Sequence, residues 1–208
     1  MPVNTSRGDP FVFVGQRLWL DFVNTLGGSR DAPDEMLRDA GALVRWLQAA
    51  GVLDAERSAG MLRRAQQQPA GATAALADAR RIRSVLRQLA EEGARDASVR
   101  RDVVAEINRV LGRSAGTRRL EAHGDGTFTR AFVPGGDAFA GLVIPIVESA
   151  ADALVHHELP RVRRCAAPNC QRVFQDTTKN AARRWCDMTT CGNRAKAERF
   201  RSRGAGHA

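Results

Sequence analysis

The four cysteines of this chain all lie near its C-terminal end and divide into two pairs. Four residues separate the members of each pair and 15 residues separate the pairs, which are formed by Cys165, Cys170, Cys186 and Cys191. A structural Zn²⁺ takes four such soft ligands from two tight turns. Disulfide bonds are the alternative, which the lack of a secretory signal disfavours. The spacing therefore predicts one structural Zn²⁺ per chain, with no open position for a catalytic water.

Net charge divides the chain at the same place. Residues 161–208 carry 12 basic and 3 acidic side chains, whereas residues 1–160 carry 20 of each, so the whole net charge of +9 lies in the C-terminal segment. We predict two modules: a body (1–160), and a basic zinc-finger module with a C-terminal helix (161–208, hereafter the C-terminal module). An excess of this sign favours a polyanionic partner.

Hydrophobic periodicity predicts that the body is mostly helical. Alternating residues around a Gly-containing turn predict a β-hairpin. The expected elements are a strand at 11–14, helices at 16–26, 34–50, 55–68, 72–92, 99–111 and 137–158, and hairpin strands at 117–122 and 127–133. We expect Gly51 to end the second helix. The predicted fold class is α+β: a mostly helical domain with a small antiparallel sheet, followed by a small four-cysteine module.

Several classes of protein are disfavoured. The 43% hydrophobic content is typical of a soluble globular protein, and no segment reaches the roughly 20 apolar residues of a membrane helix. We find no apolar signal-peptide core, no phosphate-binding glycine loop and no HExxH motif. We therefore expect a cytoplasmic protein that is not an enzyme and has no membrane partner. His156 and His157 are expected to be surface or core residues rather than metal ligands.

The end of the chain (193–203) is predicted to be a helix with Asn193 as its N-cap. Basic side chains at i, i+3 and i+7 share one face, while Ala197 and Phe200 are expected to point at the core of the module. This helix is either a solvated tail or a surface that contacts phosphates and a DNA groove. The candidate nucleic-acid-binding residues are Arg183, Arg184, Arg194, Lys196, Arg199 and Arg203.

Two further sets of residues have both a structural and a functional interpretation. Phe174 and Trp185 lie between and beside the cysteines, where a small core around the metal is favoured over base stacking. Asp21, Asn24 and Thr25 share one stripe of an otherwise apolar helix. That stripe is a candidate ligand pocket, or it ties the helix to neighbouring segments through buried hydrogen bonds.

The motifs Phe174-Gln-Asp176, Arg183-Arg-Trp-Cys186 and Cys191-Gly-Asn-Arg194 are specific. Residues 163–203 resemble the CGNR zinc-finger family, which has these motifs in this order. The body is similar to the ABATE domain, which precedes this finger in bacterial stress-induced transcription regulators. That similarity rests mainly on residues 20–25 and on Trp46-Leu47.

The resemblance implies a zinc-dependent, nucleic-acid-binding C-terminal end and a body with a sensing or assembly role. We therefore expect a bacterial DNA-binding transcription regulator that responds to stress or to a ligand. DNA is the expected partner, with a small-molecule effector and a second copy of the chain as further candidates. The alternative is an RNA- or protein-docking zinc module attached to a ligand-binding domain.

Overall fold

The computed structural model describes residues 11–29, 31–95, 98–113, 116–122, 128–134, 139 and 141–205. Side chains are described throughout these ranges except at 116–122, 128–134 and 203–205. In this part of the chain, helices dominate and the strands form three two-stranded antiparallel sheets. Together with the C-terminal cysteine cluster, this confirms the predicted α+β class.

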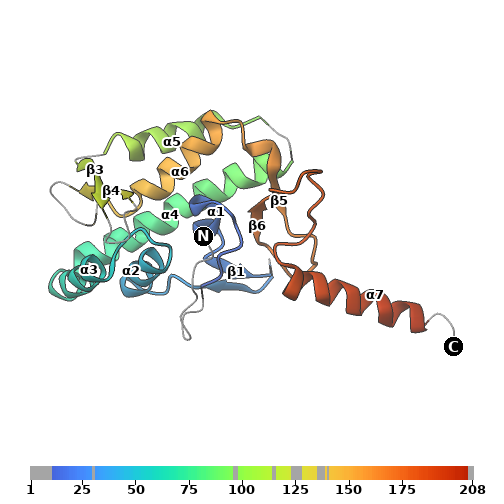
Figure 1. Ribbon diagram of the computed structural model, residues 1–208. Coiled ribbons are helices and arrows are strands. Elements are labelled where there is room, and N and C mark those ends of the chain that lie inside the picture. The colour runs from blue at the N-terminus through green and yellow to red at the C-terminus, as the bar shows by residue number, and fades with distance from the viewer. Residues whose placement is uncertain are drawn as a thin grey trace.

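The longest helix, α4 (Pro69–Ala94), runs through the middle of the molecule (Figure 1). Pro69 lies in its first turn, where a missing N–H leaves no hydrogen bond unmade. Its apolar stripe, which includes Leu76, Ile82 and Leu86, is buried against the other helices of the body. The helix predicted at 72–92 is confirmed and extends slightly further at both ends.

The first helix, α1 (Leu18–Val23), is shorter than the helix predicted at 16–26. Gln16 has a φ of 63°, in the left-handed region, so a right-handed helix cannot include it. After α1 the chain enters β1 (Leu26–Gly28), which pairs antiparallel with β2 (Pro33–Glu35).

The helix predicted at 34–50 also begins later than expected, because its first residues belong to β2. Helix α2 (Ala40–Ala49) begins where the Asp39 carboxylate accepts a hydrogen bond of 2.6 Å from the N–H of Ala42. Gly51 follows the end of this helix with a φ of 73°, the left-handed conformation predicted for it.

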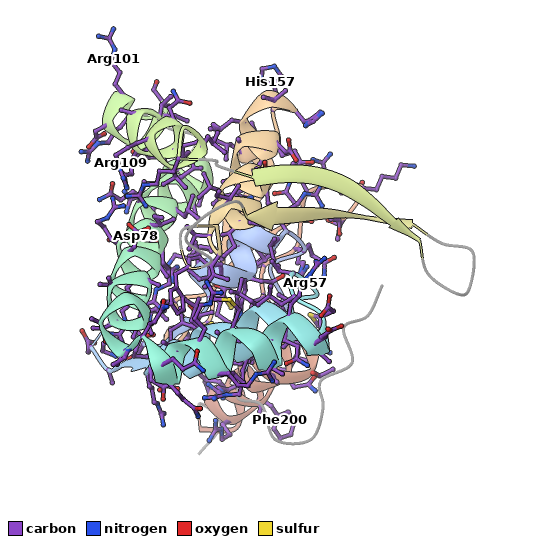
Figure 2. All side chains as sticks on the ribbon, turned by 90° about the vertical axis from the view of Figure 1, so that its left-hand side faces the viewer. Arg57, Asp78, Arg101, Arg109, His157 and Phe200 are labelled. Atoms are coloured by element: carbon purple, nitrogen blue, oxygen red, sulfur yellow. The ribbon has the colours of Figure 1, made fainter. Side chains whose placement is uncertain are left out.

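The remaining helices of the body are α3 (Ala55–Gln67), α5 (Arg101–Leu111) and α6 (Ile144–Val155). The predictions for α3 and α5 are confirmed, but the helix predicted at 137–158 is wrong at its start, because a turn at 141–143 precedes α6. Ion pairs join α4 to α5, and Figure 2 shows Asp78 and Arg109 on the neighbouring surfaces of these helices, 4.0 Å apart.

The predicted hairpin is confirmed as β3 (Gly116–Ala122) and β4 (Phe128–Pro134). The strands are antiparallel, with Leu120 opposite Arg130. The predicted turn at 123–126 lies outside the described residues.

Residues 11–14 do not form the predicted strand, although Phe11 and Val14 are buried. The segment lies between the two modules: Val12 and Val14 pack with the cysteine cluster, whereas Phe11 and Phe13 pack with the core of the body. The carbonyl of Gly15 accepts a hydrogen bond of 2.9 Å from the N–H of Gln175, but no ladder forms among these described residues. A Cβ on Gly15 would lie 2.7 Å from the backbone N of Asp21, so this close approach requires glycine.

The turn η1 (Leu159–Arg161) leads from the body into the C-terminal module, which continues with the hairpin strands β5 (Val162–Arg164) and β6 (Val173–Gln175). The module ends with a π-helical turn, η2 (Met188–Gly192), continuous with α7 (Asn193–Ala205). In Figure 1, α7 projects away from the rest of the molecule.

The hairpin of the C-terminal module is packed into the body. Val162 and Val173 belong to the same buried cluster as the helices of the body. A Cβ on Gly93 of α4 would lie 3.0 Å from the carbonyl oxygen of Leu159, so a glycine at this position lets the chain pass close to α4. In the part of the chain that the structure describes, no helix is long and apolar enough to cross a membrane.

Candidate functional site: the four-cysteine metal centre and helix α7

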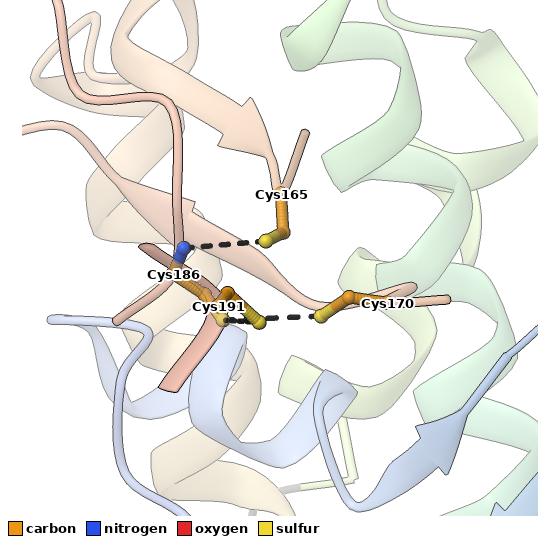
Figure 3. A group of neighbouring side chains, drawn as sticks. All are labelled: Cys165, Cys170, Cys186 and Cys191. Carbon is orange, nitrogen blue, oxygen red and sulfur yellow. Dashed lines mark hydrogen bonds between the residues drawn. The ribbon is translucent and has the colours of Figure 1, made fainter. Parts of the chain in front are cut away.

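The four cysteine sulfurs lie close enough together to bind one metal ion (Figure 3). All of them lie within 4.8 Å of one another, and the Sγ of Cys186 lies 3.8 Å from that of Cys170 and 3.7 Å from that of Cys191. A tetrahedron with Zn–S bonds of about 2.3 Å has S–S edges of about 3.8 Å. The donor set and its dimensions therefore fit a single structural Zn²⁺.

Two separate segments bring these ligands together. Cys165 follows β5 and Cys170 precedes β6, so one pair lies on the turn of the hairpin. The N–H of Cys165 donates to the carbonyl of Arg172 (2.9 Å), which closes that turn. The second pair joins them when the N–H of Cys186 donates to the sulfur of Cys165 (3.4 Å).

The chemistry of these sulfurs favours a metal over disulfides. The four cysteines are free and buried, and their sulfurs are much further apart than the roughly 2.05 Å of a disulfide bond. Hydrogen bonds from the thiols of Cys170 and Cys186 lower the pKa of Cys165. The shared hydrogen bond with Cys165 raises the pKa of Cys170 to about 11. Four thiolates this close together repel one another, and a divalent cation removes that repulsion.

Asp176 of the Phe-x-Asp motif holds the loop that leads to the second cysteine pair. Its buried carboxylate accepts hydrogen bonds from the hydroxyl (2.6 Å) and N–H (2.9 Å) of Thr178 and from the N–H of Arg183 (2.8 Å). Burial raises the pKa of Asp176, but these hydrogen bonds together lower it by more than burial raises it. The net shift of the pKa is therefore downward. The carboxylate therefore stays ionised and fixes the start of the Arg-Arg-Trp-Cys segment.

Arg183, a predicted nucleic-acid contact, is turned into the module. Its Cζ lies 4.4 Å from the centre of the Phe174 ring. Its Nε donates to the carbonyl of Trp185 (3.0 Å), and its Nη2 donates to the carbonyl of Cys186. The structure thus gives Arg183 a role in building the metal site.

The two aromatic residues near the cysteines, Phe174 and Trp185, differ in burial. Phe174 is fully buried beside the cysteines, which agrees with the interpretation of it as a core residue. Trp185 is half-buried, and the exposed guanidinium of Arg184 lies over its ring at 5.3 Å.

The N-cap prediction for the C-terminal helix is wrong. The helical segment begins one turn earlier, at η2, where the carboxylate of Asp187 accepts hydrogen bonds from the N–H of Thr190 (2.8 Å) and the hydroxyl of Thr189 (2.6 Å). Asn193 instead donates from its amide to the carbonyl of Thr189 (3.1 Å). Because Cys191 lies within η2, the metal site fixes the position from which α7 starts.

Helix α7 does not turn its apolar residues toward the core, contrary to expectation. Phe200 is 82% exposed and Ala197 is also exposed, because α7 leaves the module without packing on it. The predicted contacts Arg194, Lys196 and Arg199 are exposed on this helix. Arg203 lies in the helix, but its side chain is outside the described residues.

The stripe of Asp21, Asn24 and Thr25 is engaged by protein groups. Asp21 accepts a hydrogen bond of 2.7 Å from the N–H of Gly15, and burial raises the pKa of Asp21 to about 7. The hydroxyl of Thr25 donates to the carbonyl of Phe22 (2.7 Å) and accepts from Arg83 (2.9 Å).

Asn24 uses both ends of its carboxamide on the backbone of Val173 in β6, at 2.8 and 2.9 Å. Asn24 therefore joins the body to the C-terminal module, whereas Asp21 and Thr25 tie α1 to other parts of the body. The proposed ligand role remains a prediction.

Two residues at this junction escaped the sequence analysis. Arg87 of α4 donates to the carbonyls of Gln171 (2.7 Å) and Val23 (3.3 Å), and burial lowers the pKa of Arg87 to about 10. Gln171 in turn donates to the carbonyl of Gly27. The available signal was a pair of arginines, Arg83 and Arg87, at i and i+4 beside the apolar stripe of α4.

The comparisons with known proteins agree with this arrangement. Residues 16–157 match the ABATE family, described as "Putative stress-induced transcription regulator". Residues 161–204 match the CGNR zinc finger. No curated protein matches the chain. The chain therefore belongs to the ABATE family of regulators and carries a CGNR zinc finger behind its ABATE domain.

Proposed function

We propose that this regulator binds duplex DNA through its C-terminal module, with α7 as the contacting helix. The observation that carries the proposal is the position of α7, a 13-residue helix that projects from the metal site. At 1.5 Å per residue, such a helix is about 20 Å long, which is long enough to lie along a DNA groove.

The composition of α7 supports a binding role over a packing role. Among the described side chains of α7, Phe200 is the one large apolar residue, and a helix without a continuous apolar stripe has no face to bury in its own protein. Its exposed cations outnumber its one acid, Glu198; they are Arg194, Lys196, Arg199 and Arg201. Arg184, exposed over the ring of Trp185, is a further cation of the module.

The metal site supplies the rigidity that such a contact needs. Cys191 lies in η2 directly before α7, and the Asp187 carboxylate caps this turn. When zinc is bound, it is expected to fix the start of α7 through Cys191, while the hairpin holding Cys165 and Cys170 is anchored on the body. In this proposal, the residues of the module orient the helix and the cations of α7 bind the phosphates.

A selection from random duplexes with the zinc-loaded full chain tests the proposal. We expect specific sequences to be enriched. For about four to six phosphate contacts, log K should fall against log salt concentration with a slope of about −4 to −5. The variant Lys196→Gln/Arg199→Gln should reduce the magnitude of the slope by about two.

A matched control removes two cations elsewhere. Arg63 and Arg64 are exposed on α3, at the far end of the body from α7 in Figure 1. The variant Arg63→Gln/Arg64→Gln has the same net charge as the α7 variant, and its binding should match that of the wild type. Equal losses in both variants, or no duplex binding with zinc bound, would contradict the proposal. Binding to RNA or to a protein alone would favour the docking alternative.

A further inference from the structure

The most exposed large apolar side chain among the described residues lies on α7. Phe200 is 82% exposed, compared with 71% for Val155, 47% for Met188 and 38% for Val104. In Figure 2 it lies at the edge of the molecule, away from the helices of the body. Nothing in the described part of the chain covers this ring.

The neighbours of Phe200 on the helix surface are basic on one flank, with Lys196 and Arg203, and small on the other, with Ala197 and Gly204. Residues four apart share a helix face, so Lys196 lies directly behind the ring, and Arg203 occupies the next position of the same face. Arg199 precedes Phe200 in the chain, and its Nε donates to the carbonyl of Ala195 (3.3 Å). Glu198 and Ser202 lie on the opposite side of the helix. The face therefore presents one aromatic ring with cations along one flank.

The charge beside the ring of Phe200 decides which partner could cover it: a second copy of α7 or duplex DNA. A second α7 packed against this face would bring two sets of cations together, which opposes association. A partner that fits must offer negative charge around a small apolar patch. In the major groove of duplex DNA, the 5-methyl group of thymine is such a patch, with phosphates on either side. The groove is about 12 Å wide and admits an α-helix of about 10–12 Å diameter.

We propose that Phe200 is a specificity-determining residue of α7, and that its ring packs on thymine methyl groups in the major groove while Lys196 and Arg199 bind the flanking phosphates. This inference rests on the proposed DNA-binding function. It adds a base preference that the cations cannot provide, since phosphate contacts carry no sequence information.

Replacing thymine by uracil tests this contact directly. The probes are a short A·T-rich duplex and the same duplex with deoxyuridine in place of every thymidine. The two differ only in the major-groove methyl groups. The zinc-loaded wild-type chain should bind the thymine duplex more tightly, by about fourfold for each methyl contacted, which is the worth of burying one such group.

The variants Phe200→Ala and Phe200→Leu locate the effect. Phe200→Ala should bind both duplexes equally and keep the wild-type salt slope, because no cation is lost. Phe200→Leu should keep part of the thymine preference. Val155→Ala removes the exposed apolar side chain of α6 and should behave as the wild type. Zinc content should be unchanged in all three, since neither position contacts the cysteine cluster.

The outcomes separate this inference from the function on which it rests. No duplex binding at all contradicts the proposed function. Equal binding of the two duplexes by the wild type overturns the role of Phe200 and leaves the proposed function standing. A wild-type dimer that becomes monomeric in Phe200→Ala, measured by analytical ultracentrifugation without DNA, also overturns it, because the ring would then be covered by a second copy.

Discussion

The carboxamide of Asn24, the C-cap residue of α1, pairs with the backbone of Val173 on β6 as a neighbouring strand would. Its Nδ2 donates to the Val173 carbonyl at 2.8 Å, and its Oδ1 accepts from the Val173 N–H at 2.9 Å. Both residues are buried. One side chain of the body thus satisfies the N–H and the carbonyl of Val173, at the edge of the hairpin that holds Cys165 and Cys170. The same side chain links the metal site to the helices of the body.

Replacing Asn24 with Ala should destabilise the whole chain. The N–H and carbonyl of Val173 would both lose their partner in a buried place, and each such group costs about 1–3 kcal/mol. We expect the free energy of unfolding in urea, with zinc bound, to fall by at least about 2 kcal/mol. Asn180→Ala, at an exposed position, is the control and should change it by less than about 0.5 kcal/mol. A loss confined to the C-terminal module would contradict the linkage.

Removing the metal should weaken the body as well as the C-terminal module. We expect elemental analysis to give one Zn²⁺ per wild-type chain and almost none for Cys186→Ser. Without zinc the hairpin loosens, so Asn24 and Arg87 lose their partners at Val173 and Gln171. Hydrogen exchange should then become faster in α1 and in the C-terminal half of α4.

Helix α3 provides the internal control for that experiment, because its main contacts in the described part of the chain are with α2 and α4. Its exchange should change little on zinc removal. Unchanged exchange in α1 would show that the two parts fold independently.

The buried carboxyl of Asp21 should make stability depend on pH near neutrality. Burial raises the pKa of Asp21 from 3.8 to about 7 in the folded chain, so the folded state binds the proton more tightly than the unfolded state. Stability is therefore highest below about pH 4 as far as this group is concerned, falls as pH rises toward about 7, and then levels off. A shift of this size corresponds to at most about 4 kcal/mol.

Asp21→Asn isolates this contribution, because the amide oxygen can still accept from Gly15 but carries no charge. Unfolding by urea at several pH values between 5 and 8, with zinc in excess, should give a difference between variant and wild type that grows with pH in favour of the variant. Zinc affinity also varies with pH, but it does so in both proteins. A difference that does not change with pH would disprove the shift.

The metal ligands were predictable because their chemistry is local. Two cysteine pairs at the right spacing need no knowledge of the rest of the fold. The hairpin of β3 and β4 was also predictable, since alternating residues around a glycine-containing turn specify it. The sequence did not predict that the first residues of the expected helix at 34–50 belong to a strand, because β2 forms only through pairing with β1. Likewise, the apolar run at 11–14 forms no strand, because its residues pack on distant parts of the chain: Phe13 stacks on Trp46, and Val14 packs with the cysteine cluster.

Side-chain roles in the C-terminal module were harder to predict for the same reason. Periodicity places Phe200 on a face of α7, but only the direction of the helix decides what that face meets. Arg183 and Arg199 look alike in the sequence, yet the ring of Phe174 and two carbonyls hold Arg183 inward. Such differences depend on tertiary contacts.

These two arginines should therefore respond in opposite ways to the same substitution. Arg183→Gln removes the contact with Phe174 and the hydrogen bonds to Trp185 and Cys186. We expect the free energy of unfolding to fall by about 1–3 kcal/mol, while the salt dependence of DNA binding by the folded, zinc-loaded chain is kept. Arg199→Gln should leave stability within about 0.5 kcal/mol and reduce the magnitude of the salt slope by about one. Urea unfolding and binding titrations on both variants check this, and an unchanged stability with a weaker slope in Arg183→Gln would place its guanidinium on the DNA instead.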